Sequence, residues 1–163
     1  MPINASTTSS PASSGIYDKT QQQSQNNSNH QKILIVEDND ELREYLRRTL
    51  SEQYNIQVCS NGKEALTIVK EYMPNLVISD IMMPEMRGDE LCHILKNDIE
   101  TSHIPIILLT ALNTDKNIIE GLQSGADEYI VKPFNIGILR ANIANLLTNR
   151  ALLHHKYASL DLH

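Results

Sequence analysis

Long apolar runs and clusters of basic residues are both missing from this sequence of 163 residues. No apolar stretch approaches the ~20 residues of a membrane-spanning helix, and the first residues lack the basic start and apolar stretch of a signal peptide. The formal net charge is −6, and no run of Lys and Arg provides the electrostatic footprint of a nucleic-acid-binding protein. We therefore expect no membrane segment and no direct binding to nucleic acid in this chain.

Cysteine is scarce as well. The sequence contains only Cys59 and Cys92, which are far apart and form no C-x-x-C pair. This usage is typical of a reduced, cytoplasmic protein, in which both residues serve as small core or surface side chains. The chain is long enough for one domain with a sizeable core.

Apolar periodicity is absent from residues 1–31, where Ser, Thr, Gln and Asn dominate. Such a composition cannot bury enough apolar surface to offset the entropy lost on ordering. We expect this segment to be a disordered linker or a cloning remnant, with no functional site of its own.

From Lys32 onward, short apolar runs alternate with segments whose apolar residues recur at helical spacing. The runs predict strands at residues 33–36, 56–59, 76–79, 106–109 and 129–131. Five strands alternating with five helices favour an α/β fold with a doubly wound, five-stranded parallel sheet in the order 2-1-3-4-5, flavodoxin-like, with helices on both faces. We place this domain at residues 32–150 and expect residues 151–163 to form a helical extension or tail.

Polar residues stand at the carboxyl ends of four of these strands. Glu37 and Asp38 follow the first strand, Asp80 the third, Thr110 the fourth and Lys132 the fifth. The first and third strands are neighbours in the expected order, so three carboxylates converge at the edge where ligands bind in such sheets. Each residue alone would read as a turn or a helix cap, but the whole set predicts a site.

Three close carboxylates repel one another unless a cation neutralises them. Mg²⁺ takes oxygen ligands, keeps several waters and often binds phosphate groups. A lysine and a hydroxyl opposite the carboxylates complete the parts of a phosphoryl-transfer site with a carboxylate nucleophile. The residues therefore predict Mg²⁺-dependent phosphoryl chemistry at Asp80.

Four motifs give the chain a specific resemblance: I-L-I-V-E-D-N, D-I-M-M-P-E-M-R-G, L-L-T-A and Y-I-V-K-P-F, in this order. From Lys32 to about Leu147 the sequence resembles the receiver domain of bacterial two-component response regulators. The resemblance implies that Asp80 is the phosphoacceptor, which attacks the phosphorus of a phosphohistidine to form an acyl phosphate. It also implies a signalling module rather than an ordinary enzyme, one that supports its own phosphotransfer and slow dephosphorylation.

The resemblance also implies roles for the neighbours of Asp80. Asp38 would ligate Mg²⁺ directly, Glu37 would act through water, and the backbone carbonyl of Met82 would be a further ligand. Glu37 stands where many members of the family have Asp, so its reach to the metal is longer by one methylene. Met82 and Leu112 would flank the path by which water attacks the phosphoryl group.

The resemblance assigns the switch to residues of the last two strands. Thr110 and Lys132 would contact the phosphoryl oxygens, and Tyr129 would be the aromatic rotamer switch. The Lys132–Pro133 bond would be cis, which an X-Pro bond allows at low cost.

Three other functions compete with this interpretation. A degenerate receiver would act as a phosphorylation-independent interaction platform, but it would usually lack the acceptor or the lysine. A phosphohydrolase resembling the haloacid dehalogenase group needs a second Asp where Met82 stands. A flavodoxin-like binder of nucleotide or flavin needs glycines or hydroxyls in its first loop, where Glu37 to Asp40 would repel phosphate.

The expected partners follow from the resemblance. The phosphodonor would be a histidine kinase domain, in the same chain or a separate one, and the protein would be cytoplasmic or the cytoplasmic part of a membrane-anchored hybrid kinase. We expect no output domain in this chain, whose role would be to gate an output such as transcription. A homodimer could form through the helix around residues 118–122, the strand at 129–131 and the last helix, whose expected exposed charges are Asp115, Lys116, Glu120, Asp127, Glu128 and Arg140.

Overall fold

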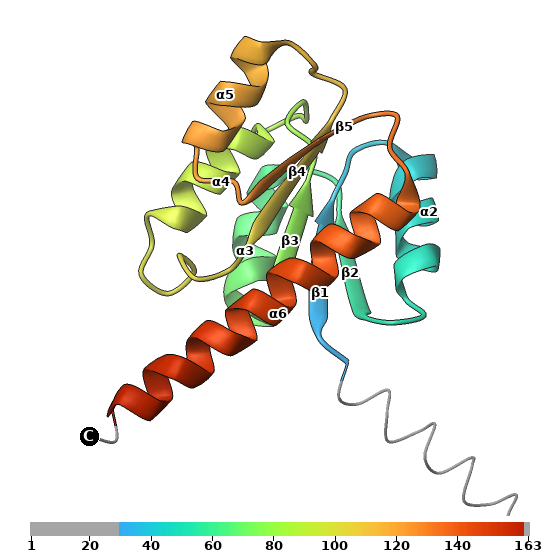
Figure 1. Ribbon diagram of the computed structural model, residues 1–163. Helices are drawn as coiled ribbons and strands as arrows, with labels where there is room; N and C mark the ends of the chain where they lie inside the picture. The colour runs from blue at the N-terminus through green and yellow to red at the C-terminus, as the bar shows by residue number, and fades with distance from the viewer. Residues whose placement is uncertain (1–29, 162–163) are drawn as a thin grey trace, which may run out of the picture. The chain divides into compact units, whose positions relative to one another are not determined.

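The computed structural model describes residues 30–161, which form a parallel sheet between two layers of helices (Figure 1). The expected linker at residues 1–31 lies almost wholly outside the described residues. The strands are β1 (Lys32–Val36), β2 (Asn55–Cys59), β3 (Leu76–Ser79), β4 (Ile106–Thr110) and β5 (Glu128–Val131). The helices are α2 (Asp40–Leu50), α3 (Gly62–Tyr72), α4 (Gly88–Lys96), α5 (Asp115–Gln123) and α6 (Ile136–Asp161).

The strand order is β2-β1-β3-β4-β5, and every neighbouring pair is parallel. This order confirms the doubly wound sheet expected from the sequence. Strands β1, β3 and β4 read as nearly continuous apolar runs because helices cover both of their faces. The chain reverses its direction of winding between β1 and β3, and in sheets of this kind ligands bind beyond the carboxyl ends of the strands at such a point.

Alternation along each strand divides the core into two halves. Leu34 and Val36 of β1 face one side, where they pack with buried side chains of α3 and α4. Ile33 and Ile35 face the other side, where α2 and α6 supply the apolar partners. Figure 1 shows α2 and α6 together on one face of the sheet and α3, α4 and α5 on the other.

Helix α6 is unusually long. Its first half buries Leu139, Ile143 and Leu147 against the sheet, and the helix then continues past residue 150 to Asp161. At the start of this second half, Arg150 forms an ion pair with Asp127, which precedes β5, at 3.5 Å. None of the helices within residues 30–161 has the length and hydropathy needed to cross a bilayer.

Candidate functional site

The site begins with the register of two central strands. Val36, the last residue of β1, pairs with Ser79, the last residue of β3. The backbone N–H of Asp80, the residue directly after β3, donates to the carbonyl of Val36 at 3.1 Å. Both strands therefore end at the same level of the sheet, and the three carboxylates that follow them lie close together there. Oxygen atoms of Glu37, Asp38 and Asp80 all lie within 4.8 Å of one another.

The carboxylate of Asp80 is held by three donors. Its Oδ1 accepts hydrogen bonds from the backbone N–H groups of Ile81 at 2.6 Å and Met82 at 3.2 Å. Its Oδ2 accepts a hydrogen bond from Nζ of Lys132 at 2.8 Å. The turn after β3 and the lysine after β5 thus fix the group in one orientation before any ligand arrives, which is the preorganisation that a nucleophile needs.

Lys132 connects the two ends of the acidic cluster. Its backbone N–H donates to the carbonyl of Thr110 at 2.8 Å, which continues the pairing of β4 with β5. Its Nζ lies 2.7 Å from Oε1 of Glu37 and 2.8 Å from Oδ2 of Asp80. Burial alone disfavours the ammonium, but hydrogen bonds and the charges of the two carboxylates outweigh it and raise the pKa of Lys132. The bond from Lys132 to Pro133 is cis.

Glu37 is the most buried member of the cluster. Burial raises the pKa of its carboxyl group, although Lys132 opposes this effect. Its Oε2 has no hydrogen-bond partner among the residues that the structure describes. A buried carboxylate oxygen without a donor is costly, and a single ammonium does not balance three carboxylates. The set therefore fits a hard divalent cation such as Mg²⁺, with exposed Asp38 facing solvent at its rim.

Thr110 and Tyr129 lie next to this cluster without contacting Asp80 through a hydrogen bond. The sequence placed Thr110 just after a strand, whereas the structure makes it the last residue of β4 and buries it completely. Its Oγ1 accepts a weak hydrogen bond from the backbone N–H of Leu112 at 3.4 Å. The phenol of Tyr129 donates to the carbonyl of the same Leu112 at 2.8 Å. Burial, with the charge of Asp80 as a second cause, raises the pKa of Tyr129.

Two residues near the site were missed in the sequence. A Cβ on Gly88 would lie 1.8 Å from the carbonyl oxygen of Asp80, so only glycine lets α4 begin against the loop that follows β3. Arg87 precedes it, and its Nη1 lies 3.3 Å from Sδ of Met82 while its Nε donates to Oδ1 of Asp89 at 3.1 Å. The glycine could have been noticed at the end of its motif, but nothing in the sequence pointed to the arginine contact.

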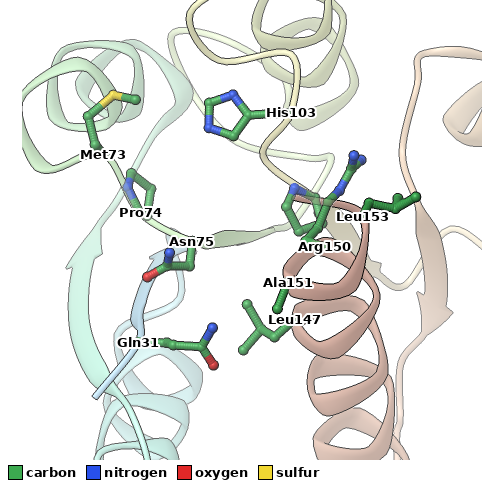
Figure 2. Close-up of a pocket in the computed structure, with 10 residues that line it drawn as sticks. Gln31, Met73, Pro74, Asn75, His103, Leu147, Arg150, Ala151 and Leu153 are labelled. Atoms are coloured by element: carbon green, nitrogen blue, oxygen red, sulfur yellow. The ribbon is translucent and has the colours of Figure 1, made fainter. Parts of the chain in front are cut away.

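A cavity of ≈680 Å³ lies at the opposite edge of the sheet (Figure 2). One wall is α6, with Leu147, Ala151 and Leu153, and the other is the connection before β3, with Pro74 and Asn75. Because the strands are parallel, this is the edge where they begin, remote from the acidic cluster at their ends. This cavity is therefore separate from the acidic cluster.

Comparison with known proteins identifies the class. Residues 33–144 match the family model described as the response regulator receiver domain. This chain therefore belongs to the receiver domain family of two-component signalling proteins, and the resemblance noted in its motifs is confirmed.

Relatives of the chain occur in two kinds of protein. It is 50% identical over 127 residues to Histidine kinase P4 of Formosa agariphila, an alignment that covers 78% of this chain and 9% of that protein. It is 44% identical over 120 residues to the probable transcriptional regulator ycf27 of Cyanophora paradoxa, covering 73% of this chain and 49% of the regulator. The chain thus spans only about a tenth of the kinase and half of the regulator.

A solved structure extends the similarity to three dimensions. The signal receiver domain of a signal transduction histidine kinase from Syntrophus aciditrophicus superimposes with a TM-score of 0.70 at 38% identity. The match covers 73% of this chain and 91% of that domain. At this identity and coverage, the likeness extends to the receiver family as well as to the fold.

Proposed function

We propose that this chain receives a phosphoryl group on Asp80 from the phosphohistidine of a histidine kinase and changes its surface in response. The observation that carries the proposal is the immobilised carboxylate of Asp80, with two backbone N–H groups on one oxygen and Lys132 on the other. Glu37 and Asp38 beside it supply the acidic pocket that fits Mg²⁺. The chain acts as a signalling module, and the transfer requires no other nucleophile.

In the transfer, an oxygen of Asp80 attacks phosphorus in line with the departing imidazole nitrogen. The new P–O bond forms as the P–N bond breaks, and the nitrogen keeps the electron pair of that bond. Lys132 moves its charge from the carboxylate to a phosphoryl oxygen, and the buried hydroxyl of Thr110 donates to another. Mg²⁺, held by Asp38, Asp80 and the carbonyl of Met82, with Glu37 acting through water, would neutralise the negative charge that gathers there.

The kinase domain must reach this edge of the sheet. Helices α2 and α6 both begin there and pack side by side, since a guanidinium nitrogen of Arg140 donates to the carbonyl of Thr49 at 3.2 Å. Tyr45 on α2 and Ile138 on α6 are 41% and 58% exposed. Two exposed apolar side chains on helices that begin at this edge suit a partner's docking helix. We place this exchange in the cytoplasm, where Cys59 and Cys92, both free, remain reduced.

The test is intact-mass measurement after incubation with a small phosphodonor such as acetyl phosphate. With Mg²⁺ we expect the mass of one phosphoryl group, and with excess chelator we expect none. A chain that stays unmodified with Mg²⁺ present, or that gains the same adduct in chelator, would contradict the proposal.

We further propose that phosphorylation promotes homodimer formation through α5, β5 and the adjoining face of α6. Ile119 and Leu122 on α5 are 53% and 45% exposed, beside the charged pair of Lys116 and Glu120. Two of the charged residues expected on this surface make contacts within the domain instead. Asp127 forms ion pairs with Lys96 and Arg150, and Arg140 donates a hydrogen bond to α2. The dimer surface is therefore more apolar than the sequence indicated.

We expect light scattering to show a larger mass once beryllofluoride and Mg²⁺ mimic the phosphoryl group. Changing Ile119 to Asp should keep the chain monomeric under the same conditions, because a carboxylate would then be buried in the interface. Identical masses with and without the mimic, over a wide range of concentration, would count against the dimer.

A further inference from the structure

The cavity at the beginning of the sheet combines an apolar lining with a single permanent charge. Among the described residues that line it, Arg150 is the only one that always carries a charge, and none is acidic. This lining is positive in a chain whose formal net charge is −6. It therefore suits a ligand that has an apolar body and a negative charge. The apolar part of the lining consists of Met73, Pro74, Pro105, Leu147, Ala151 and Leu153.

The guanidinium of Arg150 is held only loosely by the protein. Its Nη2 lies 3.5 Å from Oδ1 of Asp127, and it makes no other ion pair or hydrogen bond with the residues that the structure describes. The second oxygen of Asp127 accepts shorter hydrogen bonds, from Nζ of Lys96 at 2.9 Å and from the N–H of Ile106 at 2.8 Å. Two cations thus share one carboxylate, and Lys96 makes the shorter contact. Because a guanidinium has five N–H donors, Arg150 can still bind an anion in a bidentate manner.

The wall opposite α6 is fixed by the sheet. The backbone N–H of Asn75 donates to the carbonyl of Lys32 at 2.8 Å, and its Oδ1 accepts from the N–H of Lys32 at 2.8 Å. The carbonyl of Pro105 accepts from the N–H of Val77 at 3.0 Å. Because these hydrogen bonds hold the connections before β3 and β4, this wall exists before any ligand binds, as is usual for small-molecule sites.

Met73 contributes to the same wall at a strained position of the backbone. It is the C-cap of α3 and has a φ of 48°, in the left-handed region where helix ends favour glycine. Its side chain is 39% exposed and lines the cavity. A thioether thus stands where the backbone conformation favours no side chain, and contact with an apolar ligand gives this side chain a role.

We propose that this cavity binds a small carboxylate with a compact apolar body. The carboxylate pairs with Arg150, and the body lies between Met73 and Leu147. Figure 2 shows Arg150 and His103 toward one end of the cavity and Leu147 toward the other, so the lining has a polar end and an apolar end.

The size of the cavity favours a small molecule over a protein segment. Its volume of ≈680 Å³ lies within the range of roughly 300–1,000 Å³ that is usual for small-molecule sites. A stable protein interface needs about 1,000 Å² or more of total buried surface, which requires contacts well beyond this cavity. A ligand that contacts both α6 and the start of the sheet stabilises the folded chain, because it binds the folded state alone. The proposal does not depend on phosphorylation of Asp80.

The test compares two probes of the same shape on the full chain, naphthoate and its neutral amide, naphthamide. Calorimetry should show saturable binding of naphthoate to one site, with naphthamide about tenfold weaker because it cannot form the charge-assisted pair with the guanidinium. Amide chemical shifts in NMR spectra should change at residues 73–75, 103–105 and 147–153, while those of the acidic cluster stay the same.

Four variants separate charge from space. Arg150→Gln should weaken naphthoate about tenfold and leave naphthamide unchanged, whereas Lys116→Gln, which removes an exposed charge of α5 outside the cavity, should change neither. Ala151→Leu places a larger side chain in the cavity and should weaken both probes. Asn149→Leu is its matched control at an exposed position that does not line the cavity. Amide signals of β1 and β3 report whether each variant is folded.

Three results would overturn the proposal. The first is no saturable binding of naphthoate or of decanoate, an aliphatic carboxylate. The second is an equal effect of Arg150→Gln and Lys116→Gln on naphthoate, and the third is a set of shift changes that lies away from the cavity. If neither carboxylate binds but an acidic, leucine-rich peptide shifts the same amides, the cavity is a docking site for a protein and the small-molecule proposal is wrong.

Discussion

Replacing Asp80 with asparagine is expected to abolish phosphoryl transfer to this chain. The amide keeps the size of the carboxylate, and its oxygen can still accept from the backbone N–H groups of Ile81 and Met82, which now hold Oδ1. The amide has no carboxylate oxygen that can attack phosphorus and form an acyl phosphate. The variant should therefore fold and still show no phosphoryl group by intact mass with Mg²⁺ and acetyl phosphate.

Two further variants separate the roles within the acidic cluster. Asp38→Ala keeps Asp80 but removes an exposed carboxylate that we expect to bind Mg²⁺, so phosphorylation should become slower and need more Mg²⁺. Asp40→Asn is the matched control: Asp40 is an exposed carboxylate two residues further on, paired with Arg43 and outside the cluster. It should be phosphorylated like the wild type. A normal yield of the phosphoryl adduct on the Asp80→Asn variant would show that Asp80 is not the acceptor.

The arrangement of the sheet could be predicted because its strands have a simple physical signature. Strands buried on both faces, such as Leu76–Ser79, read as short unbroken apolar runs bounded by polar residues. The rule that ligands bind beyond the carboxyl ends of parallel strands then placed Glu37, Asp80 and Lys132 together although 95 residues separate the first from the last. The structure brings these three side chains into direct contact.

Contacts that depend on how helices are placed could not be predicted. The ring of Tyr129 lies so close to Gly121 that a Cβ there would be 2.5 Å from its Cε2. This approach depends on the distance between α5 and β5, for which a single sequence has no local signal. The same holds for Arg87, which stands at the N-cap of α4 yet makes no capping hydrogen bond and reaches Met82 instead. The binding of Asp127 to Lys96 and Arg150 likewise joins elements that are distant in the sequence. Periodicity identifies the face of a helix, but not which side chain lies opposite.

The lifetime of the phosphoryl group is the second large effect that we expect. An acyl phosphate is lost when water attacks phosphorus in line with the departing oxygen of Asp80, so a group that orients this water speeds its loss. From the family resemblance, we expect Met82 and Leu112 to flank this path. Neither side chain can orient a water or accept its proton. We therefore expect slow decay in the wild type.

The structure makes Met82 the cleaner of the two positions to change. Its side chain is 54% exposed, while its N–H touches Oδ1 of Asp80, so a polar replacement stands beside the acceptor without disturbing the core. Leu112 packs partly against the core and accepts the hydrogen bond of Tyr129, so Leu112→Glu requires a parallel check of stability. Arg87 also contacts Met82, through a sulfur that asparagine lacks.

We expect Met82→Asn to shorten the lifetime by about tenfold, which corresponds to about 1.4 kcal/mol less barrier, and Leu112→Glu to act in the same direction. Met82→Leu is the matched control, because leucine is as apolar as methionine and can orient no water, and its decay should equal that of the wild type. The measurement is the fraction phosphorylated by intact mass over time, after the phosphodonor is removed and with Mg²⁺ kept constant. Unchanged or slower decay in both polar variants would show that these side chains do not govern the access of water, and faster decay in Met82→Leu would show that bulk rather than polarity is what matters.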